Sequence, residues 1–380
     1  MNLEDKVTMA KLEIGIVHIP LVTPFKTALR TVERVDDLLV RITSDDGMVG
    51  FGEAPPTKAI TGETLESIER TIRENIAPAI ALLSETASGG EILSCIQNCC
   101  PGNTSAKAAV DIAIYDLLAR KKGLPLYRFL GKEKTKGQQT LSTDLTISVN
   151  PIQEMVDDAM SAVRRGFRSL KIKVGKEGEK DLERIKAIRD AVGSDVAIRV
   201  DANQGWTEGE AVSILNKAQD MGLGIELVEQ PVKASDLEGM AYVKAHTKTL
   251  IVADESAFHE EDARNIFALD AADLVNIKLM KCGGLYEAEK IARTAGNFGK
   301  HVMMGCMLES KISVSAAAHF AASQGDLVLA VDLDGPMLCS EDPYVGGPVY
   351  DGPSIVLNET PGLGINEVDP SFLDSWERIL

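Results

Sequence analysis

The sequence predicts an α/β protein in which a closed barrel of parallel strands follows a smaller α+β domain. The chain has 380 residues, of which 44% are hydrophobic, so it can hold a barrel of about 250 residues and a second domain. From about residue 140 onward, short apolar runs alternate regularly with helical sequence. The residues before about 125 lack this alternation and indicate hairpin strands followed by helices.

Eight apolar runs are expected to form the strands of the barrel. They are rich in Val, Ile and Leu with little polar alternation, which is typical of parallel strands covered on both faces. Eight alternating βα units favour a closed barrel over an open sheet, and the G-x-G-x-x-G turn of a dinucleotide-binding sheet is missing. The runs cover residues 143–148, 168–174, 196–201, 225–229, 249–254, 273–279, 301–305 and 329–334. Two of the intervening helices should begin at capping boxes, Thr207 with Glu210 and Ser235 with Glu238.

The first domain is expected to combine antiparallel strands with two helices. Asp45-Asp46-Gly47 is a hairpin-turn signal between two apolar runs. The strand segments are residues 11–25 and 36–54, and the helical segments are residues 63–83 and 103–123. We expect three parts: an α+β domain at 1–125, the barrel at 126–345, and a C-terminal segment at 346–380 that packs back on the first domain.

The composition excludes two classes of partner. The formal net charge is −17, and such an acidic surface repels nucleic acid. No run approaches the ~18 apolar residues of a membrane span, and no leader pattern is present, so a cytoplasmic location is expected. The six cysteines are scattered without a C-x-x-C pair and are interpreted as reduced thiols. The oligomeric state stays open, and a homo-oligomer is compatible with the sequence.

Charged residues recur at the carboxyl ends of the predicted strands, which is where barrel proteins carry their chemistry. Lys173, Asp201, Glu229, Asp254 and Lys278 follow one another at intervals of 28, 28, 25 and 24 residues. Each interval is one βα unit, so each residue should lie beside the previous one at the same end of the barrel. A single acid at a strand end is often a helix cap, but a series in register predicts a functional site.

Three of these residues form an all-oxygen ligand set. Asp201, Glu229 and Asp254 should lie on adjacent strands, and buried carboxylates need a cation as partner. Oxygen ligands of this kind suit Mg²⁺, with Mn²⁺ as a substitute. The five histidines show no zinc-type spacing and are interpreted as structural.

Lysines are expected to flank this ligand set on opposite sides. Lys171 and Lys173 point to the same face of their strand, and Lys278 comes from a strand across the barrel. Burial and a neighbouring like charge both lower a lysine pKa, so these lysines are expected to act as bases near neutral pH. Two bases facing each other across a cation-bound carbonyl suggest removal of an α-proton from one face and its return to the other.

The motifs KIKVG, DANQGW, VEQP, ADES and NIKLMKCGG occur in this order at fitting spacing. With them the chain resembles the enolase superfamily, in its muconate-lactonising subgroup, over essentially its whole length. The resemblance implies a (β/α)7β barrel and an α+β capping domain that the C-terminal tail completes. It also implies that Lys173 and Lys278 transfer the proton, with Lys171 as the charge that lowers the Lys173 pKa.

The segment VDLDG at the eighth strand indicates which members of the subgroup the chain resembles most. Asp332 and Asp334 resemble the acidic pair with which dipeptide epimerases bind the free α-ammonium group of their substrate. Two further carboxylates would repel an anionic substrate and would pair well with a cationic group. The resemblance therefore implies a small-molecule dipeptide as substrate, with proton transfer at the α-carbon of its C-terminal residue.

Two loops indicate which dipeptide. Residues 23–32 resemble the loop of L-Ala-D/L-Glu epimerases in which Arg30 would meet the glutamyl carboxylate, as expected for an arginine fork. The segment GCMLES at 305–310 offers Met307 and no extra acid, which argues against cationic dipeptides. The resemblance thus favours L-Ala-L/D-Glu derived from peptidoglycan. An N-acylamino acid racemase, an o-succinylbenzoate synthase and a ligand-binding barrel without catalysis stay open as alternatives.

Overall fold

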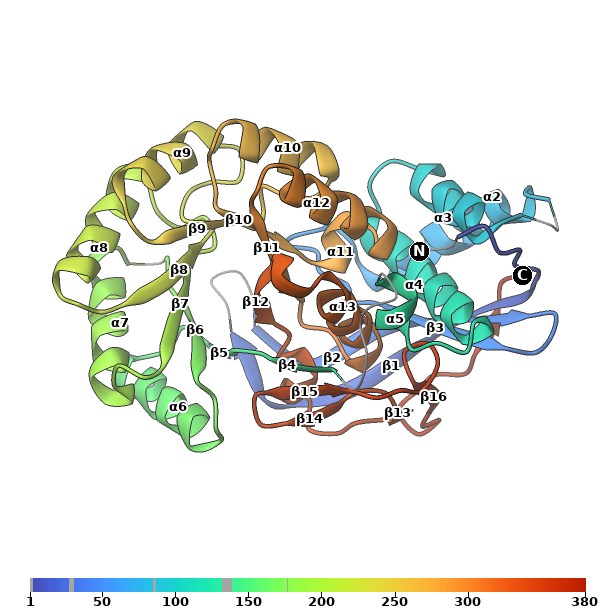
Figure 1. Ribbon diagram of the computed structural model, residues 1–380. Helices are drawn as coiled ribbons and strands as arrows, with labels where there is room; N and C mark the ends of the chain where they lie inside the picture. The colour runs from blue at the N-terminus through green and yellow to red at the C-terminus, as the bar shows by residue number, and fades with distance from the viewer. Residues whose placement is uncertain (1–2, 27–30, 85–86, 132–138, 176) are drawn as a thin grey trace.

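The computed structural model describes residues 3–26, 31–84, 87–131, 139–175 and 177–380 (Figure 1). Within these residues, eight parallel strands run in the order β5 to β12. The ring closes where the Asp144 N–H donates to the Val331 carbonyl at 3.3 Å. The strands are β5 (Leu145–Ile147), β6 (Ser169–Lys173), β7 (Ala197–Asp201), β8 (Ile225–Glu229), β9 (Leu250–Ala253), β10 (Leu274–Ile277), β11 (His301–Gly305) and β12 (Val328–Asp332). The predicted fold class is confirmed, since each strand lies inside its predicted run apart from Val328 at the start of β12.

Helices cover the outside of the strands, as the arc of α6 to α10 in Figure 1 shows. They are α6 (Ile152–Arg164), α7 (Glu179–Val192), α8 (Glu208–Asp220), α9 (Leu237–His246), α10 (Glu260–Ala268), α12 (Leu285–Asn297) and α13 (Lys311–Gln324), with the short α11 (Leu279–Cys282), η2 (Gly325–Leu327) and α14 (Gly335–Leu338). The capping box of Thr207 and Glu210 at α8 is confirmed. The second box is wrong, because the N-cap of α9 is Asp236, whose side chain accepts from the Gly239 N–H at 2.8 Å.

An apolar layer fills the barrel below the carboxyl ends of its strands. The layer is a buried cluster separate from the main core, and its members are Leu227, Val252, Leu274, Met303 and Ala330. Side chains two positions apart on a strand share a face. Glu229, Asp254 and Asp332 each lie two positions beyond a member of this cluster, so they too point into the barrel, one layer higher.

The capping domain is a four-stranded antiparallel sheet with helices packed against it. Its strands lie in the order β17 (Glu377–Arg378), β1 (Met9–Lys26), β2 (Thr31–Ser44) and β3 (Val49–Ala54). Its helical segments are α1 (Leu65–Thr71), the π-helical η1 (Ile72–Ile76), α2 (Ala77–Ala81), α3 (Gly89–Asn98), α4 (Thr104–Lys121) and α5 (Leu126–Leu130). Gly47 forms the predicted hairpin turn with φ of +82°. Gly52 allows α4 to approach β3, because a Cβ there would lie 1.8 Å from the Ala109 carbonyl oxygen.

The C-terminal residues connect the capping domain to the barrel. Two small sheets pair β13 (Tyr344–Gly346) with β16 (Ile365–Val368), and β14 (Val349–Asp351) with β15 (Ser354–Leu357) and β4 (Gln139–Ser142). The buried Asp116 on α4 accepts from the Phe51 N–H of β3 at 2.9 Å and from the Leu363 N–H of the tail at 2.7 Å. In the described part of the chain, no helix is long and apolar enough to cross a membrane.

His319 on α13 supports the interpretation of the histidines as structural. Its ring is buried and stacks on Tyr127, and its Nδ1 accepts the Tyr127 N–H at 3.0 Å. Burial, only partly offset by a backbone hydrogen bond at Leu363, lowers the pKa of His319 to about 3. The neutral ring is therefore part of the folded state.

We predict that His319 makes the protein sensitive to acid. Its pKa is lower in the folded state than in the unfolded one, so its contribution is complete above about pH 6.5 and is lost as the pH falls toward 3. At pH 5 the loss should be about 2 kcal/mol, at 1.36 kcal/mol per pKa unit. Urea unfolding at pH 7.5 and 5.0 should show a smaller loss in His319→Gln than in the wild type. The exposed His246→Gln serves as control, and equal losses in all three proteins would contradict the prediction.

Candidate active site

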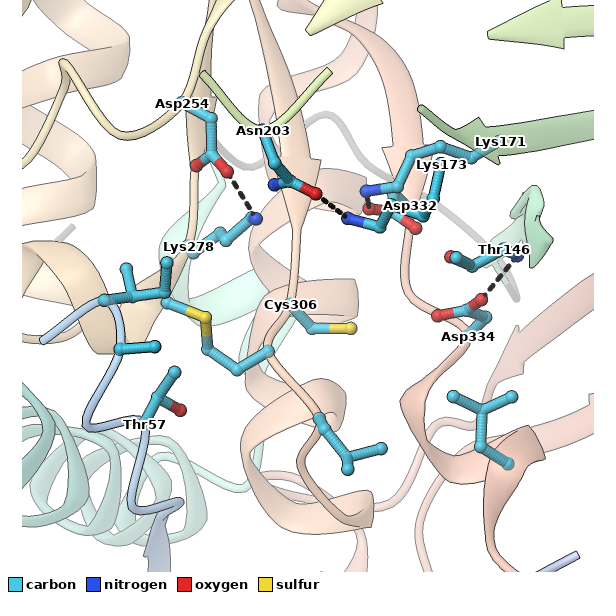
Figure 2. Close-up of a pocket in the computed structure, with 15 residues that line it drawn as sticks. Thr57, Thr146, Lys171, Lys173, Asn203, Asp254, Lys278, Cys306, Asp332 and Asp334 are labelled. Atoms are coloured by element: carbon cyan, nitrogen blue, oxygen red, sulfur yellow. Dashed lines mark hydrogen bonds and ion pairs between the residues drawn. The ribbon is translucent and has the colours of Figure 1, made fainter. Parts of the chain in front are cut away.

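A pocket opens at the carboxyl ends of the barrel strands, between the barrel and the capping domain (Figure 2). Lysines and carboxylates from the strands line one side of it. The loop after β3 contributes Thr57, Ala59 and Ile60, and the loop after β11 contributes Cys306, Met307 and Leu308. The loop at residues 54–64 therefore reaches the pocket. Its end is held by Glu63, which accepts the backbone N–H groups of Ser105 and Ala106 at the start of α4.

The three predicted ligand carboxylates lie side by side. Asp201 ends β7, Glu229 ends β8 in register with it, and Asp254 directly follows β9. Their exposed fractions are 0%, 0% and 2%. Carboxylates this deeply buried require compensating positive charge.

The three lysines supply that charge. Lys173 donates to Asp201 Oδ2 at 2.6 Å, and Lys278 donates to Asp254 Oδ2 at 2.7 Å. Lys171 donates to Glu229 Oε2 at 3.3 Å and forms a short contact with Asp332. Lys171 and Lys173 come from β6, and Lys278 follows β10 on the far side of the pocket, as Figure 2 shows.

The second oxygen of each carboxylate has its own donor. The Asn203 N–H donates to Asp201 Oδ1 at 2.9 Å, and Asn276 Nδ2 donates to Glu229 Oε1 at 2.7 Å. Lys281 Nζ donates to Asp254 Oδ1 at 2.5 Å. Every ligand carboxylate thus accepts a fixing hydrogen bond on one oxygen, while its other oxygen accepts a hydrogen bond from one of the three lysines.

The donor set fits a hard divalent cation. Lys171 Nζ lies 3.6 Å from Asp201 and 3.3 Å from Glu229, and Lys278 Nζ lies 3.7 Å from Glu229 and 2.7 Å from Asp254. One cation can therefore contact neighbouring carboxylates, and oxygen donors are those that Mg²⁺ prefers. Within the described residues, no three acidic, His or Cys side chains form a ready-made metal site. The ammonium groups lie between the carboxylates instead.

The expected depression of the pKa is wrong for Lys171 and for Lys278 in this arrangement. Burial alone would lower the pKa of Lys171, but Asp332, Glu229 and Asp201 outweigh burial and raise it well above its usual value. For Lys278, Asp254 and Glu229 likewise outweigh burial and raise the pKa. Sequence reasoning counted the neighbouring lysine but not the number of carboxylates within reach. Lys171 thus serves in the structure as the partner of acids.

The acidic pair at the end of β12 lies in the pocket, and its two members, Asp332 and Asp334, have different hydrogen-bond partners. Asp332 contacts Lys171, and although burial opposes the charge, this lysine lowers the Asp332 pKa to about 2. Asp334 accepts the Thr146 N–H at 2.8 Å, and burial together with Asp332 raises its pKa to about 6. Among the described residues, only Asp332 of the two has a lysine within ion-pair distance, which leaves Asp334 as the acid better able to take a new cationic group.

The two specificity residues have different outcomes. Met307 lines the pocket, whereas Arg30 lies outside the described residues. The expectation that the segment GCMLES adds no acid is wrong, because Glu309 belongs to it. The Glu309 side chain is buried and accepts the Met307 N–H at 2.6 Å. Glu309 does not line the pocket, and burial raises its pKa to about 7.

Several polar residues of the site were not predicted from the sequence. They support other side chains and do not end a strand: Asp144, Thr146, Asn203, Glu255, Asn276 and Lys281. Asn276 lies two positions before Lys278 and so shares its face, which was a usable signal. Asn203 connects Lys173 to Glu255, with distances of 3.2 Å and 3.3 Å, and its φ of +43° is invisible in sequence.

Comparison with known proteins agrees with this geometry. Residues 11–131 match the model of the mandelate racemase / muconate lactonizing enzyme N-terminal domain, and residues 154–371 match the enolase C-terminal domain-like model. The chain belongs to the enolase superfamily. The predicted family is thereby confirmed.

Among enolase-superfamily members, the chain is similar to dipeptide epimerases. It is 48% identical to the L-Ala-D/L-Glu epimerase of Clostridium acetobutylicum, over 94% of this chain and 98% of that protein. The substrate-liganded L-Ala-D/L-Glu epimerase of Bacillus subtilis superposes with a TM-score of 0.91 at 47% identity, covering 95% of this chain and 99% of that one. The dipeptide epimerase of Enterococcus faecalis, complexed with Mg and L-Leu-L-Tyr, gives 0.86 at 38% identity, with coverages of 95% and 100%.

We predict that Mg²⁺ stabilises the folded protein through the three carboxylates. At a concentration a hundredfold above its Kd, the gain should be about 2.7 kcal/mol, seen as a higher Tm in thermal unfolding with and without chelator. Glu229→Gln removes the central negative charge and should abolish the gain. Glu226→Gln, on the same strand but at the other end of the barrel, should retain it. A wild-type Tm unaffected by Mg²⁺ would contradict the prediction.

Proposed function

We propose that this protein is a dipeptide epimerase, an isomerase that inverts the α-carbon of the C-terminal residue of a dipeptide. One observation carries the proposal: Lys173 and Lys278 face a single pocket from opposite sides, beside the acidic pair Asp332 and Asp334. Inversion of a carbon centre needs a proton acceptor on one face and a proton donor on the other. The similarity to named epimerases supports the same reaction.

The proton transfer uses the two lysines in turn. The neutral amine of one lysine takes the α-proton, and the electron pair of the C–H bond moves into the adjacent carboxyl group. The ammonium of the opposite lysine then returns a proton to the other face. Lys171 stays protonated and contributes positive charge near the developing anion.

Asp201, Glu229 and Asp254 would hold Mg²⁺, or Mn²⁺ in its place. When bound, the cation supplies positive charge that stabilises the substrate carboxylate and makes its α-proton more acidic. The chain's own part is to hold these three carboxylates in place, which the donors on Asp201 Oδ1, Glu229 Oε1 and Asp254 Oδ1 do. Hydrogen-bond donors that hold a ligand carboxylate in place in this way tune the affinity of the site for its metal ion.

The substrate we propose is L-Ala-L/D-Glu from peptidoglycan, handled in the cytoplasm. Its α-ammonium group would pair with Asp334 and Asp332, Met307 would contact the dipeptide, and Arg30 would bind the glutamyl carboxylate. A homo-oligomer is compatible with this function. We also propose the division into a capping domain at 1–125, a barrel at 126–345 and a tail at 346–380.

We predict α-proton exchange with solvent that depends on both lysines. In D₂O with Mg²⁺, wild-type protein should incorporate deuterium into L-Ala-L-Glu and form L-Ala-D-Glu, followed by mass spectrometry and chiral separation. Lys173→Ala and Lys278→Ala should each lose epimerisation by at least 10³-fold, an estimate from the loss of a general acid–base group. Exchange from one stereoisomer can persist in each variant.

The exposed Lys186→Ala is the control and should keep full activity. Near wild-type epimerisation by either lysine variant would refute the two-base mechanism. Free-amine and N-acetylated substrates are compared in the same assay. A preference for the N-acetylated form would indicate a racemase of the same subgroup, and no exchange with a broad dipeptide panel would indicate a binding protein.

We predict that two variants separate recognition of the two ends of the dipeptide. Asp334→Asn keeps an acceptor for the Thr146 N–H but loses the charge, so KM should rise about tenfold or more for all free-amine dipeptides. Arg30→Met should raise KM for L-Ala-L-Glu by a similar factor and leave L-Ala-L-Leu unaffected. Steady-state kinetics on the two substrates distinguish these outcomes, and an Arg30→Met variant with unaltered selectivity would contradict the assignment of Arg30.

A further inference from the structure

Lys281 is a lysine that the proposed reaction does not use. Its exposed fraction is 0%, and it lies on α11, one helical turn after Lys278. Its ammonium group donates to Asp254 Oδ1 at 2.5 Å, to the Asp254 carbonyl at 2.5 Å and to the Asn276 carbonyl at 3.0 Å. All three N–H groups are satisfied, so Lys281 has no donor left for a substrate.

The short helix α11 places two lysines on one carboxylate. Lys278 is its N-cap residue, and the Lys281 N–H donates to the Lys278 carbonyl at 2.9 Å. Lys278 contacts Asp254 Oδ2, and Lys281 contacts Oδ1. The far end of α11 is fixed to the capping domain, because Gln97 donates to the Gly283 carbonyl at 2.7 Å.

Lys278 and Lys281 have different roles in the proposed reaction. Lys278 must turn from Asp254 toward the substrate α-carbon in order to exchange a proton. Among the described side chains, Lys281 is then the remaining hydrogen-bond donor to the Asp254 carboxylate. Asp201 and Glu229 each accept a hydrogen bond from a neutral donor on the fixed oxygen. Among the described residues, Asp254 is the one ligand of the three whose fixed oxygen accepts its hydrogen bond from a charged donor.

We propose that Lys281 is the positioning residue of Asp254. It holds this carboxylate toward the cation and leaves Lys278 free to act on the substrate. The inference rests on the proposed function, in which Asp254 is a metal ligand and Lys278 a base. Lys107 provides a contrast, because this buried lysine donates to the Gln97 and Cys100 carbonyls, outside the pocket.

Removing Lys281 has two opposing effects on cation affinity. The loss of a positive charge reduces repulsion of Mg²⁺, which would tighten binding. The loss of the Lys281 hydrogen bonds leaves Lys278 as the remaining described side-chain donor to the Asp254 carboxylate, and Lys278 contacts Oδ2, the oxygen that Mg²⁺ would also use. We expect the second effect to dominate, because the charge of Lys281 is already matched by the carboxylate that it contacts.

The test is the Mg²⁺ affinity of the full-length protein, measured by isothermal titration calorimetry without substrate. Lys281→Met should weaken binding about 10- to 100-fold, the usual effect of losing a residue that supports a metal ligand. Lys281→Gln keeps a neutral donor but loses the charge and the reach of the lysine, so its Mg²⁺ affinity should lie between that of Lys281→Met and that of the wild type. Lys107→Met controls for the loss of a buried lysine and should keep wild-type affinity, even where its Tm falls.

The outcomes distinguish this inference from the proposed function. A folded Lys281→Met variant with wild-type or tighter Mg²⁺ binding would overturn the positioning role and leave the epimerase proposal intact. Equal Mg²⁺ affinity in the Lys281→Met and Lys281→Gln variants would also overturn it. If the Met variant does not fold, a Gln variant with unweakened affinity overturns it. Wild-type protein without Mg²⁺ binding would overturn both proposals.

Discussion

Charge compensation inside the barrel mouth is the constraint on which the rest of the site depends. Asp201, Glu229 and Asp254 are almost completely buried, and a buried carboxylate is stable only beside positive charge. The order of the strands in the barrel places positive charge beside these acids. Lysines on β6 and after β10 lie on either side of the acids at β7, β8 and β9. The proposed bases are therefore also the countercharges of the folded protein.

This double role explains why the site combines rigid and adjustable contacts. One oxygen of each acid is held by a donor that belongs to the scaffold, such as the Asn203 N–H or Asn276. The other oxygen contacts a long lysine side chain that can rotate. Below them lies the apolar layer around Leu227 and Met303.

The sequence allowed the fold and the main site residues to be predicted for the same reason. Parallel strands buried on both faces leave continuous apolar runs, and one βα unit separates each charged strand end from the next. The sequence did not show the distances between charged groups that are far apart in the chain. The pKa direction of Lys171 depends on how many carboxylates surround it, and the direction in which Glu309 points depends on the loop after β11. The cap of α9 differed by one residue, because Ser235 and Asp236 are both competent caps.

The pairing of β17 with β1 has a consequence for how the protein is made. Both strands belong to the sheet of the capping domain, yet the whole barrel lies between them in the chain. Asp116 of the capping domain likewise accepts a hydrogen bond from the Leu363 N–H, which is synthesised after the barrel. During synthesis on the ribosome, the capping domain therefore emerges first but cannot finish its sheet until residues 377–378 are released. The sheet of the domain that covers the pocket is therefore completed only after the barrel residues have been synthesised.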